Sequence, residues 1–209
     1  MMDNFGLCVI LTNPRRSHAD IARICVDEGV RMLQLREKTW SDRKILTISE
    51  DIRKITSGTD TLFFINDRPD LARIAGADGL HIGQDDVPAA SARKIIGREI
   101  QLGISTHTLQ QVNHISEKIC DYIGFGPVYP TPTKAEPDPV TGPDILKTVL
   151  CRSPVPVVAI GGINRKNLDR LLQMGIRNAA MVRELMETRE TDRRIRWIMN
   201  RFRDAGALH

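Results

Sequence analysis

The chain has 209 residues, of which 41% are hydrophobic and 27% charged, and its formal net charge is +4. This composition is ordinary for a globular protein and argues against a disordered chain, and no apolar run approaches the ~18 residues of a membrane span. The cationic excess favours anionic ligands, but only 4% of the residues are aromatic and no basic stacking stretch occurs. Nucleic acid is possible on charge alone, and small phosphorylated molecules fit as well. Of these we expect the small molecules as partners, with no nucleic acid and no membrane.

Length and the first residues set further expectations. We expect one domain, residues 1–209, because a chain of this length buries a substantial core. The opening segment "MMDNFGLCVILTN" has neither the basic region nor the cleavage site of a secretory leader, so we expect a cytoplasmic protein. The cysteines show no metal-binding or redox spacing, and we expect them to be buried free thiols. They are Cys8, Cys25, Cys120 and Cys151.

Short apolar runs recur along the chain, and each predicts a β-strand. They are residues 7–12, 32–37, 62–67, 79–83, 101–105, 122–127, 155–162 and 178–182. Segments with helical periodicity lie between them, for example residues 18–29 and 164–175. This alternation predicts parallel strands connected by helices.

Three of the helix-like runs end at a glycine that is soon followed by a strand: Gly29, Gly76 and Gly175. Glycine favours this position because it adopts the left-handed conformation that closes a helix. Eight units in 209 residues average about 26 residues each, near the ~200-residue lower limit of an eight-stranded barrel. We predict a single (β/α)8 TIM barrel. An open doubly wound sheet is the alternative, but "LTNPRRSHAD" stands where its glycine-rich turn belongs.

Two later segments do not fit the regular repeat. Residues 126–143, "GPVYPTPTKAEPDPVTGP", form the longest irregular stretch and predict a mobile loop after the sixth strand. The C-terminal "DRRIRWIMNRFRDAG" places Ile195, Ile198 or Met199, and Phe202 on one face. We predict the final barrel helix there, with a solvated cationic face, rather than a helix that rests on a membrane.

The active site of such a barrel lies at the carboxyl ends of its strands, and polar residues follow most of the predicted strands. They are Gln34, Arg36, Glu37 and Lys38 after the second strand; Asn66 and Asp67 after the third; Gln84, Asp85 and Asp86 after the fourth; Ser105 and His107 after the fifth; Thr131, Thr133 and Lys134 after the sixth; Gly161 and Gly162 after the seventh; and Arg183 after the eighth. Cations, carboxylates, hydroxyls and a glycine pair thus converge on one rim.

Two acids on this rim predict a metal site. Asp67 and one carboxylate of "HIGQDD" follow neighbouring strands, which lie ~4.8 Å apart, so the two acids can share one small volume. Like charges held together need a cation, and Mg²⁺ takes one or two protein carboxylates together with phosphate oxygens and water. Arg36, Lys38 and Lys134 would hold the remaining charge of a diphosphate. Capping of turns or helices by Asp67 and Asp86 is an equal alternative on spacing alone.

A second anion site is predicted at "AIGGIN", residues 159–164, together with "NAAMVREL", residues 178–185. Barrel enzymes often bind a phosphate monoester there, through backbone N–H groups of a glycine turn and of a helix start. The alternative is a tight turn that needs glycine only for its positive φ.

Taken together, these segments resemble the thiamine-phosphate synthase family. The matching segments are "QLREK" at 34–38, "IND" at 65–67, "ADGLHIGQDD" at 77–86, "GIST" with "HT" at 103–108, "DYIGFGPVYPTPTK" at 121–134 and "VVAIGGI" at 157–163. They occur in the family's order and cover about residues 7–185.

The resemblance implies a transferase that joins a hydroxymethylpyrimidine diphosphate to a thiazole phosphate, with thiamine phosphate and pyrophosphate as products. It implies a pyrimidine-diphosphate site formed by Gln34, Arg36, Lys38, Asn66, Ser105 and Lys134, Mg²⁺ ligands Asp67 and Asp86, and a thiazole-phosphate site formed by Thr131, Thr133, Gly162, Val182 and Arg183. Of these residues, Arg36, Lys38, Ser105 and Lys134 are expected to take part in catalysis. Asp85 is not expected to bind the metal directly.

No protein nucleophile is needed for this chemistry. Pyrophosphate leaves readily once its charge is neutralised, and the electron-rich aminopyrimidine stabilises the cation that remains. Catalysis then rests on electrostatic support of the leaving group and on alignment of two substrates. We therefore do not assign Ser105 and His107 as nucleophile and base, and expect a satisfied polar or turn role for His107.

One segment departs from the family. "MVREL" places Arg183 and Glu184 where the family has a small residue and then an "SAI"-like segment with a serine, and Asn178 replaces a common glycine. Arg183 could pair with the phosphate, could fill its pocket, or could be a solvated arginine at a helix start.

Two other functions remain as alternatives to the synthase. Relatives with thiazole tautomerase activity tend to carry a histidine where Pro127 stands, and both magnesium aspartates are present here, which argues against that enzyme. The second alternative, suggested by "MVREL", is a relative that binds phosphate ligands without turnover. The sequence does not reveal the oligomeric state, and a homo-oligomer is one of the possibilities that it leaves open.

Overall fold

In the computed structural model, which describes residues 4–132 and 138–208, parallel strands close into a barrel in chain order, with β1 beside β8. The strands are β1 (Gly6–Leu11), β2 (Met32–Leu35), β3 (Leu62–Asn66), β4 (Gly79–Ile82), β5 (Gln101–Thr106), β6 (Tyr122–Phe125), β7 (Val157–Ala159) and β8 (Asn178–Met181). Each predicted strand is confirmed within a few residues. The predicted TIM barrel is therefore confirmed, and the open doubly wound sheet was the wrong alternative.

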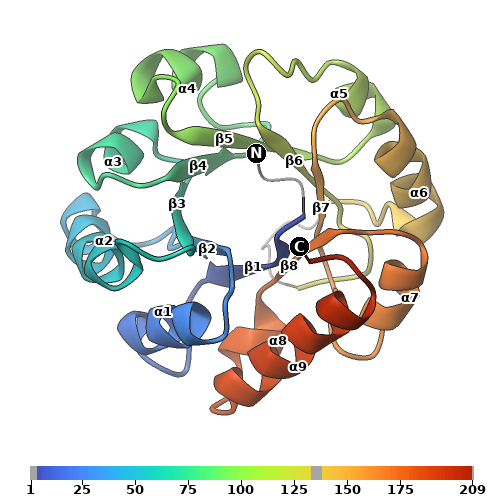
Figure 1. Ribbon diagram of the computed structural model, residues 1–209. Helices are drawn as coiled ribbons and strands as arrows, with labels where there is room; N and C mark the ends of the chain where they lie inside the picture. The colour runs from blue at the N-terminus through green and yellow to red at the C-terminus, as the bar shows by residue number, and fades with distance from the viewer. Residues whose placement is uncertain (1–3, 133–137, 209) are drawn as a thin grey trace.

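Helices surround the strands, as the view along the barrel shows (Figure 1). They are α1 (His18–Asp27), α2 (Asp42–Thr56), α3 (Pro69–Ile74), α4 (Ala89–Ile96), α5 (Leu109–Asn113), α6 (Gly142–Arg152), α7 (Leu168–Gln173), α8 (Arg183–Met186) and α9 (Thr191–Asp204). Gly29, Gly76 and Gly175 have φ values of 72°, 60° and 94°, which confirms their predicted role as helix stops.

Two apolar layers account for the architecture. The larger layer lies between strands and helices and includes Leu33 and Ile65, whereas a smaller cluster fills the inside of the barrel and includes Met32 and Phe64. Neighbours in sequence therefore face opposite layers, as the period of a β-strand requires. Inside the barrel a Cβ on Gly79 would collide with the Phe64 ring, so glycine makes room for that ring. Side chains fill the barrel at this level, and a cavity opens nearer the carboxyl ends of the strands.

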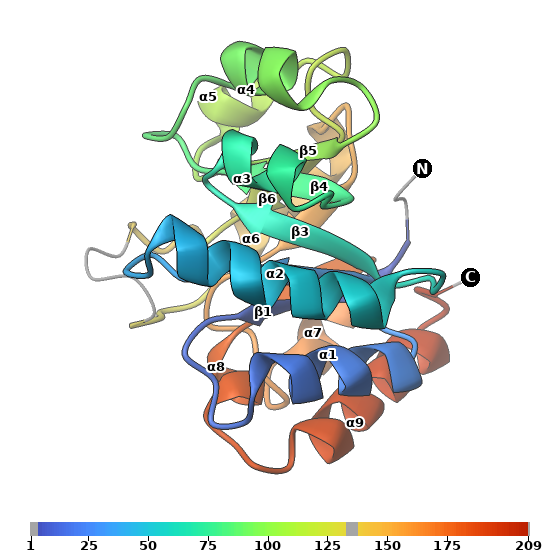
Figure 2. The same ribbon diagram turned by 90° about the vertical axis from the view of Figure 1, so that its left-hand side faces the viewer.

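The C-terminal helix differs in one respect from the prediction. The short helix α8, which sequence analysis did not predict, comes first, and α9 then packs against α1, α8 and β1. The predicted apolar face of α9 is buried and its arginines lie outside, where Arg196 pairs with Glu28 at 2.6 Å and Arg201 with Asp169 at 2.8 Å. α9 lies beside α1, as the side view shows (Figure 2). Over residues 4–132 and 138–208, the protein has no helix with the length and apolarity that a membrane crossing requires.

The cysteine prediction is confirmed for three residues and wrong for one. Cys8, Cys25 and Cys120 are buried free thiols, as predicted. Cys151 is also unpaired but is exposed, because it lies in the last turn of α6 on the side turned away from the barrel.

Candidate active site

A cavity of about 720 Å³ opens at the carboxyl end of the barrel. Its walls include these predicted site residues: Gln34, Arg36, Asn66, Ser105, Thr131, Gly162, Val182 and Arg183. Lys38 and Asp67 instead line an adjoining cavity of about 180 Å³, and Asn66 borders both cavities. Asp86 lines neither of these cavities, and Thr133 and Lys134 lie outside the described residues.

The two predicted metal ligands come together at the ends of β3 and β4. Asp67 has a φ of 63°, a conformation that aspartate tolerates better than most residues, and its N–H donates to the His81 carbonyl at 2.8 Å. Asp86 accepts a hydrogen bond from the Gly83 N–H at 2.7 Å. Burial raises the pKa of Asp67, and the neighbouring Asp86 carboxylate raises it further, against the opposing effect of Lys38. The two acids thus share a partly dry volume.

The alternative, that these acids cap turns or helices, is wrong for the helices and holds for one turn. Arg68 and Pro88 occupy the N-cap positions of α3 and α4, so neither aspartate is a helix cap. Asp86 does brace the turn after β4 through Gly83, and Asp67 meets Lys38 Nζ at 3.1 Å from its Oδ2 atom. One oxygen of each carboxylate is therefore engaged in a protein contact.

This donor set fits Mg²⁺. Within the described part of the chain, histidine, cysteine, aspartate and glutamate side chains form no group of three or more that could hold a metal. Two carboxylates are nevertheless sufficient for Mg²⁺, which completes its shell with phosphate oxygens and water. Asp85, which was not expected to be a ligand, is exposed.

A hydrogen-bonded network on the cavity floor was not predicted from the sequence. His81 Nδ1 lies 2.9 Å from the Tyr122 hydroxyl and His81 Nε2 lies 2.9 Å from Ser105 Oγ. Burial holds the pKa of Tyr122 well above its usual value, so its hydroxyl keeps its proton and can donate to Nδ1. The Nε2–H group then donates to Ser105, and the serine hydroxyl can donate to a ligand in the cavity.

Strand register explains why these residues meet. His81 lies opposite Asn66 and Gly103, and Gly103 lies opposite Tyr122, so all belong to the inward-facing set. The sequence could have indicated His81: it lies two residues after Gly79 on the fourth predicted strand and therefore faces the same side of the sheet as Gly79. The Tyr122 ring, however, reaches it only because Gly103 has no side chain, which is a fact of packing.

His107 was expected to have a satisfied polar role, and its contacts agree. Its Nδ1 atom lies 2.5 Å from the Gly126 carbonyl oxygen, and its Nε2 atom lies 3.7 Å from Asp138. The backbone N–H of His107 donates to the Gln111 side chain at 2.6 Å. This histidine therefore holds the loop after β6 to the loop after β5.

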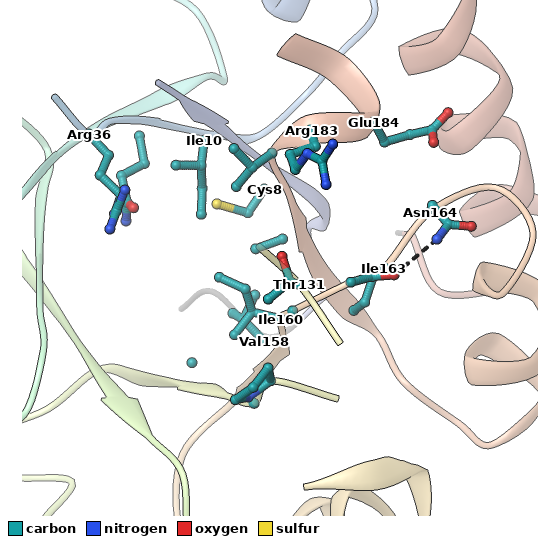
Figure 3. Close-up of a pocket in the computed structure, with 18 of the residues that line it drawn as sticks. Cys8, Ile10, Arg36, Thr131, Val158, Ile160, Ile163, Asn164, Arg183 and Glu184 are labelled. Carbon is teal, nitrogen blue, oxygen red and sulfur yellow. Dashed lines mark hydrogen bonds between the residues drawn. The ribbon is translucent and has the colours of Figure 1, made fainter. Parts of the chain in front are cut away.

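The glycine turn after β7 closes the other end of the cavity. Gly161 and Gly162 have φ values of 97° and 64°, and a Cβ on Gly162 would lie 2.6 Å from the Pro130 carbonyl oxygen. Glycine is thus required both for the backbone conformation and for the close approach of the loop after β6. The side-chain amides of Asn164 and Asn167 each donate to the Gly162 carbonyl at 3.0 Å, which fixes the turn. Figure 3 shows the bond from Asn164.

Arg183 lies at the wall of the cavity, at the start of α8. Its Nε donates to Glu187 at 2.7 Å, and about half of its side chain, 48%, is exposed. Glu184 faces two other cations, Arg165 at 2.7 Å and Arg194 at 3.1 Å. Arg36 and Arg183 line the cavity after β2 and β8, and Ile10 and Cys8 of β1 lie between them (Figure 3). The cavity coexists with Arg183, so this side chain does not fill it.

Asn178, the other departure noted in this strand, lies at the opposite end of β8. Its Oδ1 accepts hydrogen bonds from the Phe5 and Gly6 N–H groups at 2.8 and 3.3 Å, and its amide donates to the Val157 carbonyl at 3.3 Å. Asn178 therefore connects residues 5 and 6 to Val157 of β7. None of these three hydrogen bonds involves the glycine turn.

Comparison with known proteins gives consistent matches over most of the chain. A family model described as thiamine monophosphate synthase matches residues 7–185. The chain is 37% identical to a thiamine-phosphate synthase of Caldicellulosiruptor bescii over 87% of this chain and 83% of that protein. It is 40% identical to one of Lawsonia intracellularis, over 82% and 79%. A solved thiamine phosphate pyrophosphorylase from Pyrococcus furiosus superposes with a TM-score of 0.87, at 28% identity and over 96% of each chain.

Proposed function

The chain belongs to the thiamine monophosphate synthase family, and we propose that it joins a hydroxymethylpyrimidine diphosphate to a thiazole phosphate, forming thiamine phosphate and pyrophosphate. The observation that carries this proposal is the shape and charge of the main cavity. Its volume of about 720 Å³ is large enough for two small ligands, and two separate arginines line it, Arg36 after β2 and Arg183 after β8, with β1 between them. Two anionic substrates can thus bind with their reactive ends toward each other.

At the β2–β5 side, the chain holds the diphosphate. Arg36 reaches it from the main cavity and Lys38 from beside Asp67, and both neutralise charge that builds up on the departing pyrophosphate. Ser105 donates a hydrogen bond and is oriented by His81, while Gln34 and Asn66 hold the polar edge of the pyrimidine part. Lys134 belongs to the same proposed set.

Asp67 and Asp86 are proposed to hold Mg²⁺. Their all-oxygen donor set suits this ion, and the pKa of Asp67, which burial and the neighbouring Asp86 carboxylate raise despite Lys38, supports a cation between the two acids. When bound, Mg²⁺ would neutralise phosphate oxygens of the leaving group. Lys38 would then share Asp67 with the ion or turn toward the diphosphate.

At the β7–β8 side, the chain holds the thiazole phosphate. The turn at Gly162, the start of α8 at Val182 and the Arg183 guanidinium are proposed to surround the phosphate, with Thr131 and Thr133 from the loop after β6. Between the two sides the wall is apolar, with Cys8 and Ile10 prominent (Figure 3). This wall would keep water from the carbon that forms the new bond to the thiazole nitrogen.

The proposed reaction needs alignment and charge rather than a protein nucleophile. The carbon–oxygen bond to the diphosphate breaks, and the thiazole nitrogen supplies the electron pair of the new carbon–nitrogen bond. Buried Cys8 is not a candidate nucleophile, because desolvation raises the pKa of its thiol far above the usual range. Given the free thiols and charged substrates, we also propose that the enzyme works in the cytoplasm.

The direct test is to incubate the purified chain with Mg²⁺ and both substrates and to measure thiamine phosphate and pyrophosphate together. Equal amounts of the two products are expected, with none when either substrate is omitted. Tight binding of the pyrimidine diphosphate without turnover would select the non-catalytic binder instead. Isomerisation of a thiazole substrate without the diphosphate would select the tautomerase.

A further inference from the structure

Glu37 lies between the two proposed diphosphate cations, yet its carboxylate is engaged elsewhere. Its Oε1 atom accepts the Asn13 backbone N–H at 2.7 Å and lies 2.9 Å from His18 Nε2. Only 6% of the Glu37 side chain and 11% of the His18 side chain are exposed. An ionised carboxylate can only accept hydrogen bonds, so Nε2 of His18 carries the hydrogen of this contact. Glu37 thereby ties the loop after β2 to the loop after β1 and to the first turn of α1.

A second contact holds the same loop against α1. The His18 ring packs against the Trp40 ring with a centroid separation of 4.9 Å, and Lys44 Nζ covers the indole at 3.6 Å from its centroid. Residues 36–40 are thus bound to α1 and to the start of α2 through side chains that point away from the main cavity. The backbone of Arg36 is fixed as well, because its N–H donates to the Leu11 carbonyl at 2.8 Å.

We propose that Glu37 and His18 are positioning residues for the diphosphate: they fix the loop after β2 so that Arg36 and Lys38 face the phosphates before the substrate arrives. This inference rests on the proposed function. Arginine and lysine have long side chains with many rotamers, and ordering them opposes binding unless the backbone that carries them is already fixed. Glu37 supplies that restraint through its contacts with Asn13 and His18, while its side chain borders the smaller cavity beside Lys38.

The test compares variants of this pair with a control in the same region. Glu37→Ala removes the acceptor for both Asn13 and His18, whereas Glu37→Gln keeps a side-chain oxygen that can accept. His18→Phe keeps a ring against Trp40 but removes the donor nitrogen. Arg16→Ala is the matched control, because Arg16 lies in the same loop but pairs with the exposed Asp192, at 3.7 Å, and not with Glu37.

Binding of inorganic pyrophosphate in the presence of Mg²⁺ is measured by calorimetry, and KM is measured for each substrate. In Glu37→Ala we expect pyrophosphate to bind about tenfold more weakly, as displaced positioning groups typically cause, and KM for the pyrimidine diphosphate to rise similarly. In His18→Phe the loss is about threefold, since one of the two contacts to Glu37 remains. KM for the thiazole phosphate stays unchanged. Glu37→Gln recovers most of the binding, and Arg16→Ala binds as the parent does.

Several results would overturn the inference. Parent-like pyrophosphate binding by both Glu37→Ala and His18→Phe would do so, as would an equal rise of KM for both substrates, which would indicate general loosening. Should Glu37→Ala fail to fold, as judged by its thermal unfolding, His18→Phe and Glu37→Gln decide alone. A parent that binds pyrophosphate but makes no thiamine phosphate disproves the proposed function, while the binding comparison still decides the role of Glu37. A parent that binds no pyrophosphate disproves both.

Discussion

The two ends of the proposed site differ in whether side chains or the backbone shape them. At the β2–β4 end, the acidic side chains are buried or half-buried and held by contacts between loops, as the 22% exposure of Asp67 and the 6% exposure of Glu37 indicate, whereas Lys38 is 55% exposed. At the β7–β8 end, the backbone turn at Gly162 provides the shape. The charge there comes from the exposed pair of Arg183 and Glu187, whose side chains are 48% and 56% accessible.

This difference predicts where a substitution should change activity or binding most. A buried charge depends on each of its neighbours, because little water is present to replace a lost partner. An exposed ion pair is screened by solvent and contributes little by itself. We therefore expect substitutions at the β2–β4 end to have large effects, those in the glycine turn intermediate effects, and those in the exposed pair small effects.

The largest effect is expected for the acid pair. Asp67→Asn and Asp86→Asn should each lower Mg²⁺-dependent kcat at least about 100-fold, as loss of one electrostatic support of the transition state commonly does. Neither should lower the thermal unfolding temperature appreciably, since each removes one of two repelling charges. Asp85→Asn, an exposed neighbour, is the control and should keep the parental rate. Parental rates in both Asp67→Asn and Asp86→Asn would remove the metal assignment.

The glycine turn should come next. In Gly162→Ala the new methyl group meets the Pro130 carbonyl and the φ of 64° is strained, so we expect KM for the thiazole phosphate to rise about 30-fold, equivalent to the ~2 kcal/mol of such strain. Gly58→Ala is the matched control, because Gly58 has a φ of 75° but nothing within 4 Å of the added Cβ. Both variants lose some stability in thermal unfolding. Only Gly162→Ala should affect KM, and equal KM values in the two would contradict a role of this turn in binding.

Arg183 offers a smaller and more selective test. Arg183→Ala should raise KM for the thiazole phosphate about tenfold at low salt, because it removes one charge-assisted hydrogen bond to the phosphate. KM for the pyrimidine diphosphate should stay unchanged. The effect should shrink as ionic strength rises, because the site is exposed. Arg193→Ala, which breaks an exposed pair with Glu190 on α9, controls for the loss of one positive charge. A lower KM in Arg183→Ala would show instead that this arginine obstructs the substrate.

The smallest effect is expected from the partner of Arg183. Glu187→Gln releases the guanidinium from its acceptor, so KM for the thiazole phosphate should fall about twofold, in keeping with the weak competition that an exposed ion pair offers. The double variant Arg183→Ala with Glu187→Gln should match Arg183→Ala alone. If Glu187→Gln still lowered KM in the absence of Arg183, the effect would come from the lost negative charge and not from the pair.

Much of the barrel could be predicted from the sequence because the signals are local. Apolar runs bounded by glycines located the strands, and Gly29, Gly76 and Gly175 marked helix ends that need a positive φ. Strand order then placed Asp67 and one carboxylate of "HIGQDD" after adjacent strands, and the resemblance assigned Asp86. The Asp86 carboxylate does lie near enough to raise the pKa of Asp67. The helix α8 was missed because a single turn has too few residues for a periodic pattern.

The sequence by itself determined the fold, the rim on which polar residues gather and the family to which the chain belongs. The tertiary structure alone decided which polar groups meet: Lys38 with Asp67 outside the main cavity, Tyr122 and Ser105 on either side of His81, and Glu37 with His18. The physical reason is the distance along the chain over which the interactions act. Strand and helix patterns arise from interactions over a few residues, whereas each of these contacts joins separate loops or strands and depends on side-chain packing that no local pattern records.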